Sequence, residues 1–539
     1  MPRVLISDKL EIPGLDLLRE AGCDLDERAG LTGSALREAL RAADGVIVRS
    51  GTRLTAELLE NPGRLRAIVR AGVGVDNIDV AAATRSGIVV MNTPGGNTVS
   101  TAEHTITLLM ALARHIPAAD SSIRQGKWER TRFIGTQLAG KTLGVIGLGR
   151  VGREVARRAA GLDMNVVGYD PFMAPDKASQ LGIESVPDLN QLLPRCDFLT
   201  VHTPLTDETR NLIDACELAM MKPLARVLNC ARGGIVNEEA LAEALGTGHL
   251  AGAALDVFVQ EPPPRDHPLL KLPNVVVTPH LGASTAEAQA SVAREAAQLL
   301  VDFLKRGVVQ FAVNMAAVDR TELEELRLYV DMARRLGLLH AQMCQGAIQR
   351  AELSYRGEVA RRSTRLVTAA FAAGLLEHGL AESVNIVNAE LLARERGIDI
   401  VEQTNPRKGD FGTLIKADVV TEKKVYTAAA TLFGNQFLRL VQIGPYHLDS
   451  FLDGIMLIFT HHDVPGLIGF IGTILGKHQV NIAQMTVGRQ LPGGEAIAIL
   501  NLDSLPPEDA IREVRAHPKI SGLSVVKLPA AGAMPAWFG

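Results

Sequence analysis

Cysteine and aromatic side chains are both scarce in this chain of 539 residues. The five cysteines are spread without a C-x-x-C pair, a spacing that argues against a disulfide framework or a zinc site and favours a reducing compartment. They are Cys23, Cys196, Cys216, Cys230 and Cys344. Aromatic residues make up only 4%, whereas 50 glycines and abundant Ala, Val and Leu are typical of layered packing between helices and sheets.

The chain also lacks an excess of one charge and any long apolar run. Lys and Arg number 56 against 60 Asp and Glu, a net charge of −4, so general affinity for nucleic acid or anionic membranes is not expected. The N-terminal MPRVLISDKL has no apolar core of a signal peptide, and the longest helical apolar stretch, Leu366–Leu376, is too short to span a bilayer. We therefore expect a cytoplasmic protein with no metal, membrane or nucleic-acid partner.

The chain does contain a regular alternation of short apolar runs with helix patterns. Through residues 1–315, runs such as GVIVRS (45–50) and TLGVIG (142–147) predict strands of parallel, doubly wound sheets. Residues 316–452 carry α/β patterns without a chemical motif. From about Gly454 the order β-α-β-β-α-β is ferredoxin-like. The predicted fold class is α/β throughout.

A helix is expected from about Ser100 to His115. Ser100 or Thr101 is its predicted cap, and Glu103 would complete a capping box.

The most specific local motif is a G-x-G-x-x-G that follows the strand 142–146 and opens a helix at Arg150–Ala160. Gly147 allows a tight turn, Gly149 lets the backbone approach a pyrophosphate, and Gly152 permits close helix–strand packing. Asp170 ends the next strand, where its carboxylate would bind an adenosine ribose and repel a 2′-phosphate, which favours NAD over NADP. A glycine-rich turn of any α/β protein is the alternative.

Three polar side chains each follow a predicted strand, where open α/β sheets build their sites. They are Arg232 in NCARGG, Glu261 in DVFVQEPP and His280 in TPHLGAS. Taken singly, they are explained equally well as a surface charge, a loop carboxylate and a turn histidine. Taken together they fit the oxidation of an alcohol, because imidazole is a suitable base near neutral pH, a carboxylate orients it, and a guanidinium binds a substrate carboxylate.

The motifs NCARGG, ALDVF–EPP and PHLGAST resemble those of the D-2-hydroxyacid dehydrogenase family. The resemblance implies a split substrate-binding domain that flanks an inserted NAD-binding Rossmann domain, and it places the catalytic roles on Arg232, Glu261 and His280. Besides the three glycines, it places the NAD contacts on Arg150, Val151, Asp170, Thr203, Cys230, Ala231, Asp256 and Gly282. Cys230 would then line the cofactor pocket and would not be a nucleophile.

Within that family, VLISD, IVRSGTRLT, RAGVGVDNID, VMNTPGGN and GKWER are similar to the branch that acts on D-3-phosphoglycerate. The implied reaction is oxidation to 3-phosphohydroxypyruvate, the entry to L-serine synthesis. Arg49 is a candidate ligand of the substrate phosphate, and the backbone N–H groups of Gly74 and Val75 are candidates for its carboxylate. Asn97 is a further candidate substrate ligand.

A basic stretch around Trp128 contains Lys127, Arg130 and Arg132. In the family this loop lies near a dimer interface, and a solvated basic loop is the alternative. The region 316–452 occupies the place of the intervening domain of the long form, which implies tetramer assembly. The resemblance as a whole implies a homo-oligomer, either a dimer or a tetramer.

The segment HHDVPGLIG…VNIAQM resembles an ACT domain, a module that senses amino acids. The resemblance places an L-serine effector site on His461, Asp463 and Asn481, and structural turn residues are the alternative. The predicted boundaries are 1–98 and 285–315 for the substrate-binding domain, 99–284 for the NAD-binding domain, 316–452 for the intervening domain, 453–530 for the ACT domain and 531–539 for a tail.

Two other functions stay open from the sequence. The first is a dehydrogenase of another D-2-hydroxy acid, such as glycerate or 2-hydroxyglutarate. The second is a non-catalytic NAD(H) sensor of the corepressor kind, against which the ACT-like module argues.

Overall fold

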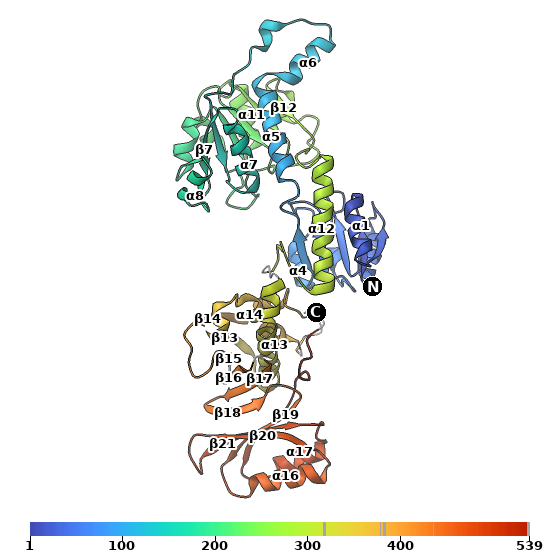
Figure 1. Cartoon of the computed structure of the whole chain (residues 1–539), viewed down its shortest axis with the longest axis vertical. Coiled ribbons are helices and arrows are strands. Elements are labelled where there is room, and N and C mark those ends of the chain that lie inside the picture. Colours follow the sequence, from blue (N-terminus) through green and yellow to red (C-terminus); the bar gives the residue numbers. More distant parts are fainter. Residues whose placement is uncertain (316–319, 378, 381–383, 435, 536–539) are drawn as a thin grey trace. The chain divides into compact units, whose positions relative to one another are not determined.

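The structure is a computed structural model that describes residues 1–315, 320–377, 379–380, 384–434 and 436–535 (Figure 1). The predicted boundary at 315/316 and the end of the predicted tail lie outside these residues. Contacts divide the chain into two units, of which one comprises 11–14 and 93–295 and the other comprises 1–10, 15–92 and 296–539. The sequence placed these divisions at 98/99 and 284/285, and each unit is described by itself below.

The first sheet is wholly parallel and has the strand order β2-β1-β3-β4-β5. Its central strand β3 is buried at all four positions, which explains its uninterrupted apolar sequence. The strands are β1 Arg3–Ile6, β2 Asp24–Glu27, β3 Gly45–Val48, β4 Ala67–Arg70 and β5 Val89–Asn92. The helices of this part of the chain are α1 Ile12–Glu20, α2 Gly33–Ala42, α3 Ala56–Leu59 and α4 Val80–Arg85.

The second sheet is also wholly parallel, and its strand order is β12-β11-β10-β9-β6-β7-β8. The order reverses at β6, whose neighbours are β7 and β9, and ligands bind at such switch points in open α/β sheets. The strands are β6 Thr142–Ile146, β7 Asn165–Tyr169, β8 Glu184–Ser185, β9 Phe198–Val201, β10 Arg226–Asn229, β11 Gly252–Leu255 and β12 Val275–Val277.

Helices accompany this second sheet along the chain. The α-helices are α5 Thr98–Ala113, α6 Ile116–Arg124, α7 Arg150–Ala160, α8 Pro175–Gln180, α9 Leu189–Leu192, α10 Ala215–Met220 and α11 Glu238–Gly246. The 3-10 turns are η1 Arg130–Phe133, η2 Leu193–Arg195 and η3 Pro268–Lys271. The long helix α12, Ala286–Arg306, follows the last strand.

The predicted cap of α5 is wrong. The helix begins at Thr98 after Asn97, and no side chain caps it. The hydroxyls of Ser100 and Thr101 instead donate to the carbonyl of Gly282, at 2.8 and 3.2 Å. Because the helix begins at Thr98, Ser100 and Thr101 lie inside its first turn and cannot cap it.

The intervening region forms a six-stranded sheet of order β14-β13-β15-β16-β17-β18, antiparallel except for the parallel pair β13–β14. Strand β15 alternates buried and half-buried residues, as expected for a sheet with one face on the core. The strands are β13 Ile348–Gly357, β14 Asp399–Asn405, β15 Thr413–Thr421, β16 Val425–Phe433, β17 Phe437–Ile443 and β18 Tyr446–Phe451. The helices are α13 Arg320–Met343, η4 Val359–Arg361, α14 Arg365–Leu376 and α15 Ala389–Glu395.

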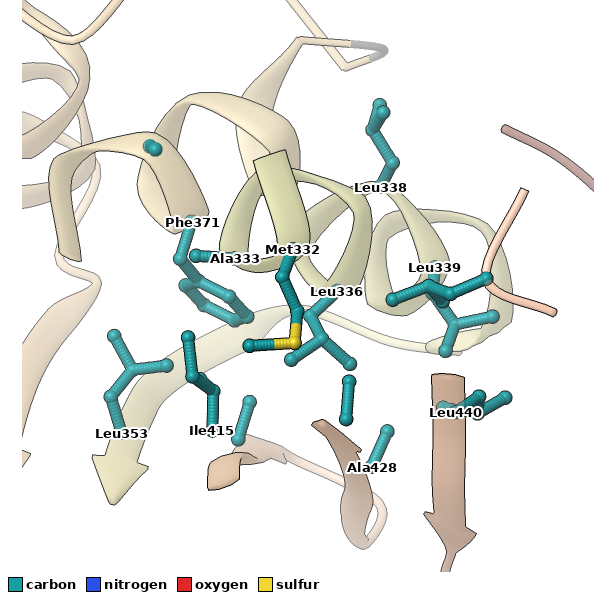
Figure 2. Close-up of a cluster of buried hydrophobic side chains, with 14 of the residues drawn as sticks. Met332, Ala333, Leu336, Leu338, Leu339, Leu353, Phe371, Ile415, Ala428 and Leu440 are labelled. Carbon is teal, nitrogen blue, oxygen red and sulfur yellow. The ribbon is translucent and has the colours of Figure 1, made fainter. Parts of the chain in front are cut away.

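Helices α13 and α14 supply the core on that sheet. Figure 2 shows Met332 and Leu336 of α13 and Phe371 of α14 above Leu353 and Ile415 of the strands. The two helices meet backbone to backbone, since a Cβ added at Gly337 would lie 2.2 Å from the carbonyl oxygen of Phe371. Glycine at this crossing therefore allows the closest approach of the helices.

The C-terminal module has the predicted order β-α-β-β-α-β and an antiparallel sheet of strand order β20-β21-β19-β22. Its elements are β19 Ile455–His462, α16 Leu467–Lys477, β20 Ile482–Arg489, β21 Glu495–Leu502, α17 Glu508–Arg515 and β22 Ile520–Lys527. One face packs on its own helices, whereas the side chains of Met456 and Ile458 join the core of the intervening domain. Burial on both faces explains the uninterrupted apolar run in β21.

No helix in the described part of the chain combines the length and the apolar character needed to cross a membrane.

Candidate active site

The loop between β6 and α7 has the geometry that the glycine motif predicts. Gly147 has φ +89°, and a Cβ on Gly152 would lie 1.9 Å from the carbonyl oxygen of Gly147. Gly149, by contrast, has open space around its Cβ position and precedes a helix whose first turn has no side-chain cap. The N–H groups at this helix start are therefore open to a phosphate.

The side chains around this loop also fit a dinucleotide. The carboxylate of Asp170 accepts hydrogen bonds from the backbone N–H groups of Leu148 and Phe172, both at 2.8 Å, which fixes it at the end of β7. Thr203, just after β9, buries its hydroxyl oxygen without a hydrogen-bond partner among the described residues. A buried hydroxyl without a partner is costly unless a ligand supplies one.

The remaining predicted NAD contacts lie in the same unit. Val151, on α7, is partly buried against the hydrophobic core of this unit. The guanidinium of Arg150 lies close to Gly95, since a Cβ added there would be 3.2 Å from Arg150 Nη1. Cys230 is buried, and this burial raises its pKa to about 12, so its thiol is not a nucleophile at neutral pH. Ala231, beside it, donates its N–H to the side-chain oxygen of Asn229 at 3.0 Å.

Arg232, Glu261 and His280 lie in the loops that follow β10, β11 and β12. His280 Nδ1 is 2.7 Å from Glu261 Oε2, and Glu261 Oε1 accepts the backbone N–H of Phe258 at 3.1 Å. The side chains of His280 and Glu261 are 48% and 39% exposed, so a substrate can reach them. The structure thus brings the predicted base and its carboxylate together.

The Arg232 loop packs directly on the loop that carries Glu261. A Cβ on Gly233 would lie 2.0 Å from the carbonyl carbon and oxygen of Phe258, so only glycine fits where the two backbones meet. The Asn229 side chain closes the same turn by donating to the Arg232 carbonyl at 2.8 Å. Glycine in NCARGG therefore brings the backbone of the Arg232 loop against the loop of Glu261, while the guanidinium itself donates to the Ala231 carbonyl at 2.7 Å.

The electrostatics of Glu261 agree with this arrangement. Burial raises the pKa of Glu261. This effect is outweighed by the hydrogen bond and charge of His280, the N–H of Phe258 and the charge of Arg232, so the pKa of Glu261 lies below its usual value. Glu261 is thus an anion at neutral pH, as a group that orients an imidazole must be.

Asp256 and Gly282 are both predicted to contact NAD; Gly282 lies in the loop that carries His280, and Asp256 packs against that loop. Asp256 is 1% exposed, and its carboxylate accepts the N–H groups of Leu281 at 2.7 Å and Gly282 at 2.8 Å. Sequence reasoning missed His104 on α5, which lies against this carboxylate. The only local signal is a histidine inside a helix, which more often denotes a core residue.

The predicted substrate ligands are divided between the units. Arg49 follows β3, its backbone N–H donates to Asp8 at 2.6 Å, and its carbonyl accepts the Asn77 amide at 2.7 Å. Gly74 and Val75 lie in the turn between β4 and α4. Asn97 belongs to the unit of Arg232, precedes α5, and buries a side-chain oxygen without a partner among the described residues.

The three predicted effector residues lie in the C-terminal module. Asp463 Oδ2 accepts Arg489 at 2.8 Å and the backbone N–H of Gly493 at 3.1 Å, and these contacts lower its pKa. Asn481 donates to Asp503 Oδ2 at 2.6 Å. His461 is buried on β19, and its Nε2 has no hydrogen-bond partner within the described residues.

The basic stretch lies on the surface of its unit. Lys127, Arg130 and Arg132 are all exposed, and Trp128 between them is 79% exposed.

Family models match three consecutive parts of the chain. They are the NAD-binding domain of D-isomer-specific 2-hydroxyacid dehydrogenases at 106–282, the D-3-phosphoglycerate dehydrogenase intervening domain at 325–444, and the ACT domain at 455–519. These matches confirm the fold class, including the ACT module, and the NAD cofactor.

Relatives match over nearly the whole chain. D-3-phosphoglycerate dehydrogenase of Methanocaldococcus jannaschii is 42% identical over 98% of this chain and 100% of its own length. The Bacillus subtilis enzyme of the same name is 40% identical over 98% of this chain and 100% of its own. Among solved structures, an NAD-dependent formate dehydrogenase of Staphylococcus aureus is 31% identical, covering 59% of this chain and 100% of its own with a TM-score of 0.52.

Proposed function

Because the chain belongs to the D-3-phosphoglycerate dehydrogenase family, an NAD-dependent branch of the D-2-hydroxyacid dehydrogenases, we propose that Arg232, Glu261 and His280 carry its reaction. That reaction is the oxidation of D-3-phosphoglycerate to 3-phosphohydroxypyruvate, the first step of L-serine biosynthesis. The observation that carries the assignment is the 2.7 Å contact between His280 Nδ1 and Glu261 beside the Arg232 loop.

Each of the three side chains has one role. Glu261 accepts the Nδ1–H of His280, which leaves Nε2 as the nitrogen that takes the proton from the substrate hydroxyl. The negative charge of Glu261 stabilises the imidazolium that forms. Arg232 binds the substrate carboxylate through paired N–H donors and so fixes the carbon that is oxidised. Bound NAD supplies the hydride acceptor.

We assign the substrate phosphate to Arg49, and its removal tests the substrate. Arg49→Ala should raise KM for D-3-phosphoglycerate about 10- to 100-fold, because charge-assisted hydrogen bonds to the phosphate are lost. KM for D-glycerate, which has no phosphate, should change little. Steady-state NADH formation from both substrates measures this. Equal effects on the two would remove Arg49 from the phosphate site, and a wild type that prefers D-glycerate or 2-hydroxyglutarate would support the other D-2-hydroxy acids.

We propose L-serine as the effector of the ACT module, since Asp463 can pair with an ammonium group and Asn481 can bind a carboxylate. Asp463→Asn keeps an oxygen for the Gly493 N–H but loses the charge. We expect serine to inhibit the wild type, and Asp463→Asn to raise the half-inhibitory concentration at least about tenfold. Asp509→Ala, an exposed acid on α17, is the matched control. A wild type indifferent to serine would refute the effector role.

We also propose a homo-oligomer, whether dimer or tetramer, formed through the segment 116–134. This segment exposes Ile116, Ile123, Trp128 and Ile134 by 54–79%, and large apolar side chains left open to solvent in one segment are what a subunit interface would cover. Ile123→Asp should therefore lower the molar mass measured by light scattering. Ile12→Asp, an exposed isoleucine on α1, should leave the mass unchanged, and an unchanged mass for both would contradict this interface.

We propose a cytoplasmic location for the protein. All five cysteines are free thiols, which supports a reducing compartment.

A further inference from the structure

The carboxylate of Asp256 holds the loop that carries His280 through hydrogen bonds to its backbone. Asp256 accepts two consecutive backbone N–H groups of the loop, from Leu281 and Gly282, and its own carbonyl accepts the N–H of His280 at 2.9 Å. His280 itself has φ +57°, a left-handed conformation that a residue with a Cβ adopts at a cost. The three hydrogen bonds that Asp256 accepts from the backbone of His280, Leu281 and Gly282 offset the energetic cost of this left-handed conformation.

His104 completes this support from helix α5. Its Nε2 lies 3.2 Å from Asp256 Oδ1 and 3.1 Å from the hydroxyl of Thr278, and its side chain is 16% exposed. The Thr278 hydroxyl donates its own proton to Asp256 Oδ1 at 2.5 Å. Both atoms that face Nε2 are therefore acceptors, and Nε2 must carry a hydrogen.

We propose that His104 is a positioning residue for the reaction, acting through its Nε2–H on Asp256 and Thr278 and so on the conformation of the loop at His280. The proposal rests on the role of His280 as the base. Without the donor, the Asp256 carboxylate keeps the Thr278 hydroxyl but loses its contact with α5, so it is held less firmly against the N–H groups of Leu281 and Gly282. The imidazole of His280 then spends less time where its Nε2 reaches the substrate hydroxyl.

Two substitutions of similar side-chain volume distinguish the effect of the hydrogen-bond donor of His104 from the effect of the space it fills. Leucine fills the space without a donor, whereas glutamine offers an N–H that can reach Asp256. His104→Leu should lower kcat about tenfold, since a small displacement of a catalytic group costs at least that much. KM for D-3-phosphoglycerate should stay within about twofold, because no substrate contact is lost. His104→Gln should recover most of the lost kcat.

NADH binding, followed by fluorescence titration, provides a readout besides turnover. Because Asp256 and Gly282 are themselves predicted NAD contacts whereas the glycine loop is untouched, the NADH affinity of His104→Leu should fall by less than its kcat does, and His104→Gln should recover both. Thr107→Ala, an exposed position on the same helix, is the matched control. Equal kcat values for His104→Leu and His104→Gln, whether high or low, would overturn the proposal, because the donor would then not matter. His280→Ala in parallel separates the two ideas: if it stays active, the assignment of the base fails, and if only the His104 variants behave like the wild type, the positioning role alone fails.

Discussion

His280→Ala should lower kcat about 1000-fold or more while leaving NADH affinity nearly unchanged. The loss is large because the variant has no group at the end of β12 that can take the hydroxyl proton, and water must serve instead. Binding should survive because most of the predicted cofactor contacts lie in the glycine loop and the strand ends around it, and the substitution removes a side chain without removing the backbone contacts of Leu281 and Gly282 with Asp256. Steady-state rates with saturating NAD and D-3-phosphoglycerate, together with a fluorescence titration of NADH, measure both quantities.

The control for this variant is another histidine of the same unit. His115→Asn replaces a residue at φ +53° with one that tolerates this conformation, and kcat should stay within about twofold. If His280→Ala kept most of the wild-type kcat, the base would have to be sought elsewhere. If it lost NADH binding as well, the rate would not report on proton transfer.

The second large effect is expected at the glycine loop, where alanine substitutions of Gly152 and Gly149 should have different consequences, one for stability and the other for NADH binding. A Cβ at Gly152 would lie 1.9 Å from the backbone oxygen of Gly147, a clash that no change of rotamer relieves. Gly152→Ala should destabilise its unit by about 3 kcal/mol or more. The measurement is calorimetry of the unfolding transition that NAD shifts upward.

Gly149 provides the matched comparison, because its Cβ position is open and its φ of −66° suits alanine. Gly149→Ala should therefore unfold at the wild-type temperature. Its NADH affinity should fall about tenfold or more, since the methyl group occupies space beside the helix start where a pyrophosphate would bind. A stable Gly152→Ala, or a Gly149→Ala that binds NADH normally, would contradict the roles given to these glycines.

These glycines show which features could be predicted from the sequence. Gly147, Gly149 and Gly152 stand in a fixed spacing between a strand and a helix, so the chemical reason for each is local. The pairing of Glu261 with His280 could be inferred because both follow strands of one parallel sheet, whose carboxyl ends share an edge.

Long-range side-chain contacts could not be predicted in the same way. Ser100 and Thr101 have the pattern of a helix cap, yet their hydroxyls bind the carbonyl of Gly282. The role proposed for His104 depends on its contacts with Asp256 and Thr278, which are distant in sequence and come close only in the folded chain. Similarly, the apolar run of β21 identifies a buried strand, but it does not say that the intervening domain covers one face.

We propose that Glu261 acts through His280, and a double-mutant cycle on kcat distinguishes this from independent action of the two residues. Glu261→Gln alone should lower kcat about 100-fold, because the imidazolium loses its carboxylate. In the His280→Ala background the same substitution should change kcat by less than about threefold, since no imidazole remains to be oriented. If Glu261→Gln lowers kcat by the same factor in both backgrounds, the two residues act independently and Glu261 does not orient His280.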